Sequence, residues 1–210
     1  MELFTILLYS HILTGGTSLL LGSYILATKK GDQQHKLLGN IFFYSMLISA
    51  IIALVMSMMH TKYFLFIIGI FTSYMLLSGK RYLQKKQVTD VEIMDWLITA
   101  MMLIFGFGFI GFGVYLLINS NNFGVVMFVF GFISMTFVLQ DYNNFTGKSK
   151  IKNYWMTSHI QRMCGAYIAS ATAFLVVNNH ILPNVVAWLL PTLIIAPLIS
   201  KWSRKYGIVK

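Results

Sequence analysis

The chain of 210 residues contains seven long apolar stretches that are separated by short polar segments. A bilayer core about 30 Å thick is crossed by a helix of about 20 mainly apolar residues, within a range of roughly 17 to 25. The stretches all fall in that range and cover residues 3–27, 38–59, 63–79, 96–118, 123–139, 155–177 and 181–200. We predict an all-α membrane protein, a seven-transmembrane-helix bundle that forms one domain over residues 1–210.

The composition excludes most other classes of protein. Hydrophobic residues make up 57% of the chain and charged residues only 10%, whereas a soluble domain carries about 25% charged residues. Disorder requires low hydrophobicity and is excluded as well. A single cysteine, Cys164, excludes an intrachain disulfide framework and a cysteine-based zinc cage. Residues 63–79 and 123–139 are short for a crossing, so a re-entrant or strongly buried helix is the alternative for one of them.

The net charge of +10 fits nucleic-acid binding or cytoplasmic membrane loops, and the positions of the charges decide between them. Fourteen of the sixteen Lys and Arg residues follow the first, third, fifth and seventh stretches; Lys62 lies on the opposite side and Arg162 lies within a stretch. Lys and Arg concentrate in cytoplasmic loops. We therefore expect an outside N-terminus, a cytoplasmic C-terminus, the lipid bilayer as partner and no nucleic acid.

The first stretch has no basic segment before it, so we expect a retained helix rather than a signal peptide.

Two histidines share a spacing with glycine. His11 lies inside the first stretch with Gly15 one turn later, and His35 precedes the second stretch with Gly39 one turn later. Ionisable residues inside a membrane span mark functional sites, and a glycine one turn away leaves space beside the imidazole. The alternative for His11 is a neutral ring that bonds a helix carbonyl or hydroxyl.

A second polar group gathers at the predicted cytoplasmic ends. His159 and Arg162 are three residues apart and share a helix face. Asp141 ends the fifth stretch at the same depth and Asp95 opens the fourth, so we expect Arg162 to pair with Asp141 or with Asp95. No Asp or Glu lies near the middle of a stretch, which argues against a carboxylate relay across the membrane and favours a pocket open to one side.

Glycines and prolines are placed inside the stretches. Four glycines alternate with aromatic and aliphatic residues over positions 106–113. No strand precedes them, so a nucleotide-binding loop is rejected, and we expect close helix packing, with a flat cofactor or lipid against the glycines as the alternative. Pro191 and Pro197 predict a kinked seventh helix.

Three segments carry a resemblance to a known family. They are the His-x-x-x-Gly motifs at 11–15 and 35–39, the segment 71–81, and the segment 159–174 with its His-x-x-Arg-Met motif. On these the chain resembles an uncharacterised family of predicted bacterial multi-pass membrane proteins. The resemblance implies an integral membrane fold in the bacterial inner membrane and points to His11, His35, His159 and Arg162 as site residues, but it implies no activity.

The histidines favour, by a narrow margin, an intramembrane ligand or redox site, most concretely a b-type haem or else a metal ion. Imidazoles from different helices are suitable axial ligands and glycines leave room for a macrocycle. His35 and His159 would form an inner pair, and His11 would pair with His60 or His180. Whether the protein is an enzyme stays open.

Two other functions fit the same residues. In the first, His159, Arg162 and Asp141 form a cytoplasmic-facing pocket of a transporter or binder of a small molecule, lipid or metal, since an Arg suits an anionic group. In the second, the chain is an assembly or accessory subunit that docks a membrane-protein partner through its glycine-rich and methionine-rich helices.

Overall fold

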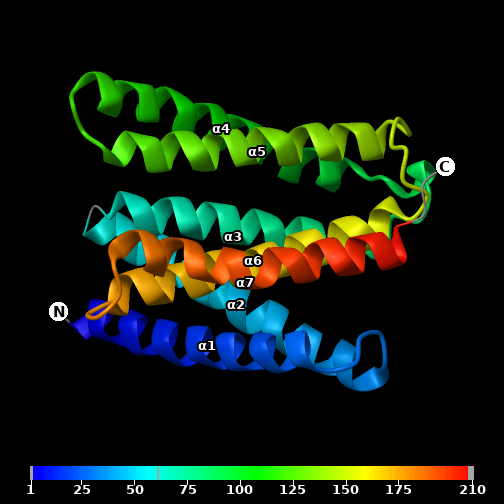
Figure 1. The fold of residues 1–210 in the computed structure, drawn as a ribbon, viewed down its shortest axis with the longest axis horizontal. Coiled ribbons are helices and arrows are strands. Elements are labelled where there is room, and N and C mark those ends of the chain that lie inside the picture. The colour runs from blue at the N-terminus through cyan, green and yellow to red at the C-terminus, as the bar shows by residue number, and fades with distance from the viewer. Residues whose placement is uncertain (1, 61, 208–210) are drawn as a thin grey trace. The chain divides into compact units, whose positions relative to one another are not determined.

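The computed structural model describes residues 2–60 and 62–207, and this part of the chain is built from helices (Figure 1). Seven helices in it are long and apolar enough to cross a bilayer, which confirms the predicted all-α class and agrees with seven candidate spans. In chain order the elements are α1 (Glu2–Ala27), α2 (Gln33–Met59), α3 (Tyr63–Tyr82), the 3-10 turn η1 (Val88–Asp90), α4 (Ile93–Ile118), α5 (Phe123–Phe145), α6 (Tyr154–Asn178) and α7 (Asn184–Tyr206).

Helices α2, α3, α4, α5 and α7 extend three or more residues beyond the predicted apolar stretches, α7 as far as Tyr206. In α2 and α5 the added turns carry polar side chains that are satisfied there. Helix α2 begins at Gln33 rather than at residue 38, since the Asp32 side chain caps it by accepting a hydrogen bond from the His35 N–H. Helix α5 continues past residue 139 to Phe145. Its last turns carry Asp141 and Asn144, both buried and hydrogen-bonded.

Helix α7 begins at Asn184, so the predicted start at residue 181 is wrong. The Asn179 side chain accepts hydrogen bonds from the N–H groups of Ile181 and Leu182 and holds them in a turn. Pro183 disfavours helical backbone at the residue before it. Hydropathy registers the apolar side chains of Ile181 and Leu182 but not this turn.

The chain divides into two compact units. The first lies within Met1–Leu76 and Met163–Ile199, and the second within Leu77–Arg162 and Ser200–Lys210. In the first unit α1 packs on α2, where the buried Ser18 hydroxyl donates to the Gly15 carbonyl and approaches the Met46 sulfur. Gly69 of α3 lies against Leu54 of α2 and leaves no room there for a larger residue.

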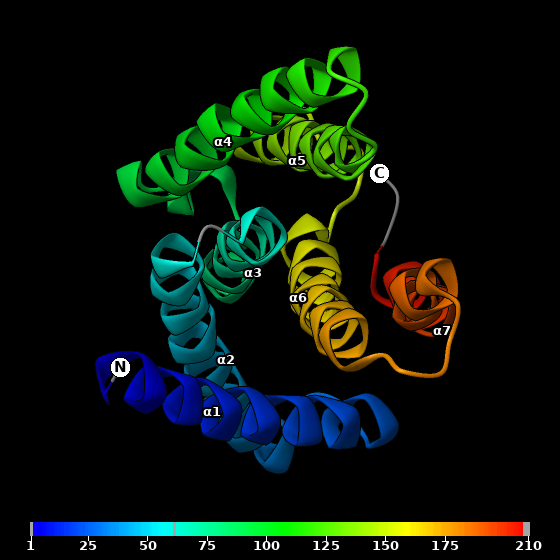
Figure 2. The ribbon, with the colours of Figure 1, turned by 90° about the vertical axis from the view of Figure 1, so that its left-hand side faces the viewer.

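In the second unit α4 and α5 pack along one another through glycines (Figure 2). A Cβ added to Gly113 of α4 would lie 3.0 Å from the Gly124 carbonyl oxygen, and one added to Gly131 of α5 would lie 3.0 Å from the Gly106 carbonyl oxygen. The predicted close packing is therefore correct for Gly106 and Gly113. Gly111, on the same helix, would meet no atom within 4 Å.

Replacing Gly113 with Leu should push α4 away from α5 and lower the free energy of unfolding by about 1–3 kcal/mol. Gly111→Leu is the matched control, and should be neutral or stabilising by up to about 1 kcal/mol because leucine favours helix over glycine. Reversible unfolding in detergent micelles measures both variants. Equal losses in the two would contradict the glycine contact.

Candidate functional site

A buried ion pair joins α5 to α6 in the second unit. The Arg162 Nη2 atom lies 2.7 Å from the Asp141 Oδ1 atom, and both side chains are 0% exposed. The guanidinium also donates to the Phe137 carbonyl at 3.2 Å and lies 3.9 Å from the centre of the Phe137 ring. Of the two partners predicted for Arg162, the structure selects Asp141.

Hydroxyl groups from two further helices converge on Asp141. The Tyr82 hydroxyl of α3 donates to Oδ1 at 2.6 Å, and the Thr99 hydroxyl of α4 donates to Oδ2 at 3.0 Å. Asn144, one turn after Asp141, donates to the oxygens of Tyr82 and Ser158, each at 3.1 Å. All of these side chains are buried. Four helices thus meet at one carboxylate that accepts several hydrogen bonds.

A second ionic cluster surrounds Asp95 at the start of α4. The Arg81 Nε atom donates to Oδ1 at 2.5 Å, and the Lys85 ammonium lies 3.0 Å from Oδ2. Asp95 and Lys85 are almost completely buried. Arg81 also pairs with Glu92, whose side chain is 65% exposed, so this cluster extends to the surface.

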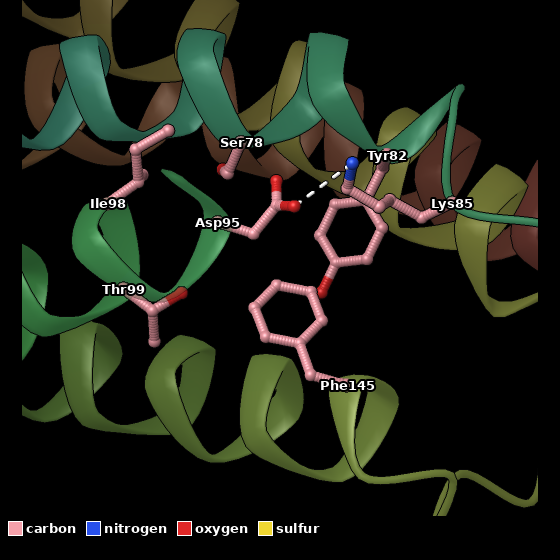
Figure 3. A pocket seen from close by; sticks show the side chains of 7 residues that line it. All are labelled: Ser78, Tyr82, Lys85, Asp95, Ile98, Thr99 and Phe145. Atoms are coloured by element: carbon pink, nitrogen blue, oxygen red, sulfur yellow. Dashed lines mark ion pairs between the residues drawn. The ribbon is translucent and has the colours of Figure 1, made fainter. Parts of the chain in front are cut away.

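A small cavity borders both clusters (Figure 3). Its volume of about 10 Å³ is close to the space that one water molecule occupies. Figure 3 shows the Lys85 ammonium turned toward Asp95. The cavity is lined by Ser78, Tyr82, Lys85, Asp95, Ile98, Thr99 and Phe145.

Both predicted intramembrane histidines bond a backbone carbonyl through Nδ1. His159 Nδ1 lies 2.8 Å from the Gly79 oxygen, and His11 Nδ1 lies 3.1 Å from the Ser49 oxygen and 2.9 Å from the Ser49 Oγ. A carbonyl only accepts, so Nδ1 carries the proton in each neutral ring. Gly15 lets Ser49 approach, because a Cβ there would lie 3.0 Å from its Oγ.

The other predicted site residues of the first unit have separate surroundings. His35 is half-buried near the start of α2, and its buried Nδ1 has no hydrogen-bond partner within the described part of the chain. A Cβ at Gly39 would meet no atom within 4 Å. The His60 ring packs edge-on against the Phe4 ring, with 4.4 Å between the ring centroids. The predicted histidine pairs, and the haem or metal ion they would bind, stay predictions. In residues 2–60 and 62–207 no three His, Cys, Asp or Glu side chains are grouped to hold a metal ion.

Several functional candidates were missing from the sequence-based set. Helical spacing could have found two of them: Asn144 is three residues after Asp141, and Thr99 is four residues after Asp95. Tyr82 and Lys85 carry no such signal, since Lys85 follows the end of α3 and its side chain meets Asp95 only in the folded chain.

Known proteins provide no identification of this site. The chain matches no protein-family model, no curated protein sequence and no solved structure. The predicted resemblance to a bacterial membrane family therefore stays a prediction. Support for a function comes only from the geometry of the site.

Removing one partner of the Arg162–Asp141 pair should leave a buried, uncompensated charge. We expect Asp141→Leu and Arg162→Met each to lower the free energy of unfolding by about 3–5 kcal/mol, and the double variant to lose much less than their sum. Chemical unfolding in micelles measures the cycle. The control Glu92→Gln, at the exposed end of the second cluster, should cost less than about 1 kcal/mol. Additive losses in the double variant would argue against a coupled pair.

Proposed function

We propose that this chain is a multi-pass transporter that moves a small anion together with a proton, using Arg162 as the anion site and Asp141 as the proton site. The proposed topology has the N-terminus outside and the C-terminus in the cytoplasm. Seven apolar helices support a bilayer location, and the one-sided distribution of Lys and Arg supports this orientation. In this topology the ion pair lies toward the cytoplasmic ends of its helices.

The observation that carries the proposal is the completely buried Arg162–Asp141 pair among apolar helices. Stability alone is a poor reason for such a pair, because well-packed apolar residues of similar volume are often as stable. Charged groups inside membrane helices are rare and mark ion or substrate pathways. The pair therefore supports a role in moving charge or a charged molecule.

The chemistry of the pair links a proton to an anion. Arg162 stays positively charged, whereas Asp141 becomes neutral when it binds a proton. A neutral Asp141 leaves the guanidinium without its counter-ion, and a ligand carboxylate or phosphate can replace it with two parallel hydrogen bonds. Each ligand then favours binding of the other by the same factor. The titratable groups that touch Asp141 are Tyr82 and Arg162, with His159 one turn from Arg162 on α6.

Binding requires the helices around the pair to separate. The cavity that Tyr82 and Thr99, the hydroxyl donors to Asp141, help to line has a volume of about 10 Å³. Ordinary ligand pockets are far larger, on the order of 300–1,000 Å³. In the proposed cycle this arrangement is the closed state, in which Asp141 occupies the place of the anion. In the empty carrier Asp141 pairs with Arg162, so neither charge is left unpaired while the helices change between their inward-open and outward-open states.

The proposal predicts a defined pH dependence of anion binding. In detergent, sodium succinate or sodium phosphate should raise the melting temperature more at acidic than at alkaline pH, relative to sodium chloride at equal ionic strength. A ligand at about 100 times its Kd stabilises by about 2.7 kcal/mol. Asp141→Asn imitates the protonated acid and should bind equally at both pH values, whereas Arg162→Gln should not respond.

Matched controls separate the site from general charge effects. Glu2→Gln removes an exposed carboxylate and Arg204→Gln an exposed guanidinium, and both should behave like the wild-type protein. In liposomes loaded with a pH-sensitive dye, the responding anion should acidify the lumen with wild-type protein but not with Asp141→Asn. Retained binding in Arg162→Gln would contradict the proposed site.

A second candidate function, a histidine-held cofactor in the first unit, is favoured by the geometry of His11. Its Nδ1–H group donates to Ser49, so the lone pair of the neutral ring resides on Nε2. Histidines that bind a metal or a haem iron commonly use this arrangement, because the second hydrogen bond fixes the ring and its tautomer. His11 therefore has the tautomer of an axial ligand.

The absorption spectrum of the purified protein, recorded before and after reduction with metal analysis in parallel, tests this candidate. A haem or metal signal held by His11 should be lost in His11→Ala and kept in His180→Ala, since His180 is an exposed loop residue. A colourless, metal-free wild-type protein from cells supplied with haem and iron would reject the candidate and leave the anion site untouched.

A further inference from the structure

We infer that the small cavity holds one water molecule, and that this water links the Lys85–Asp95 pair to the hydroxyl groups on Asp141 as the route by which a proton reaches Asp141. The inference rests on the proposed function, because it supplies the path for the proton that the anion site requires. It concerns residues of the second unit only.

The cavity has the size and the lining that a bound water needs. Its volume is about 10 Å³, and a buried water occupies about that space and makes two to four hydrogen bonds. Four of its lining residues are polar and nearly completely buried. They offer a carboxylate, an ammonium and two hydroxyls: Asp95, Lys85, Ser78 and Thr99.

Polar groups on both sides of the cavity form a series from Asp95, which shares Arg81 with a surface carboxylate, to the buried ion pair. On the outer side Glu92 is exposed and shares Arg81 with Asp95. On the inner side the Thr99 hydroxyl lines the cavity and donates to Asp141 Oδ2 at 3.0 Å. A water in the cavity would border both Asp95 and Thr99, because both residues line it.

Transfer along this series conserves every atom. A proton on Asp95 passes to the water as the Asp95 O–H bond breaks, and the water passes one of its protons to the Thr99 oxygen. Thr99 passes its own hydroxyl proton to Asp141 Oδ2, where a new O–H bond forms. The water and the hydroxyl are regenerated, so the net change is one proton moved from Asp95 to Asp141.

The charges around the two carboxylates suit a relay. Asp95 is in contact with Arg81 and Lys85, which stabilise its carboxylate form, so a proton that arrives there is passed on rather than retained. Asp141 is in contact with Tyr82 and Arg162. Glu92 beside Arg81 and His159 on α6 are the other titratable groups of this region that the argument involves.

Time-resolved infrared spectroscopy tests the route in the full-length protein. After a rapid drop in pH with inorganic phosphate present, a band from protonated Asp141 should rise, identified by its loss in Asp141→Asn. Thr99→Val removes the donor to Asp141, and Ser78→Val fills the cavity. Each should slow the rise by at least about tenfold while the final amplitude remains. Thr136→Val, an exposed threonine of α5, is the matched control and should rise at the wild-type rate.

The outcomes separate the route from the proposed function. A normal rate with full amplitude in both Thr99→Val and Ser78→Val overturns the route and leaves the proposed function standing. A wild-type protein that gives no Asp141 band overturns the proposed function and the route together. High-resolution density of the wild-type protein is independent of how the variants fold: a water within hydrogen-bond distance of Asp95 and Thr99 supports the inference, and a dry cavity overturns it.

Discussion

Charged side chains in hydrocarbon must find their counter-charges within the protein, and this requirement organises the second unit. Asp141 pairs with Arg162 of α6 while it accepts hydrogen bonds from the hydroxyls of Tyr82 of α3 and Thr99 of α4. One carboxylate thereby fixes the register of four helices. Hydrophobic burial contributes little to such fixing, because lipid tails are as apolar as the helix surfaces.

The glycine contact between α4 and α5 acts together with this polar anchor. Dispersion between close backbones holds the two helices near one end, at Gly113 and Gly124, whereas hydrogen bonds hold them near the other end, at Thr99 and Asp141. The glycine contact is tight but involves no charged or hydrogen-bonding side chain. The second changes with protonation, so a change in ionisation acts at one end of a helix pair that is otherwise firmly packed.

The parts of this fold that depend on composition were predictable from the sequence, and those that depend on tertiary contact were not. Apolar stretches located seven candidate spans, and the scarcity of charge inside them singled out Arg162, with Asp141 or Asp95 as its partner; only the structure decides for Asp141. The continuation of α5 to Phe145 was missed because hydropathy treats a satisfied Asp141 as a break. Lys85 was counted as an ordinary loop cation, since nothing in its neighbourhood along the chain reveals that its ammonium folds back onto Asp95.

The position of Ser49 beside His11 has a consequence for the first unit. The tautomer of the His11 ring depends on the distance between two helices. While α1 lies close to α2, the Ser49 carbonyl keeps the proton on Nδ1. A separation of the two helices would break this hydrogen bond and allow the proton to move from Nδ1 to Nε2. The spacing of α1 and α2 thus determines whether Nε2 of His11 is an acceptor or a donor. Gly15 sets this spacing, because it lets Ser49 approach the ring.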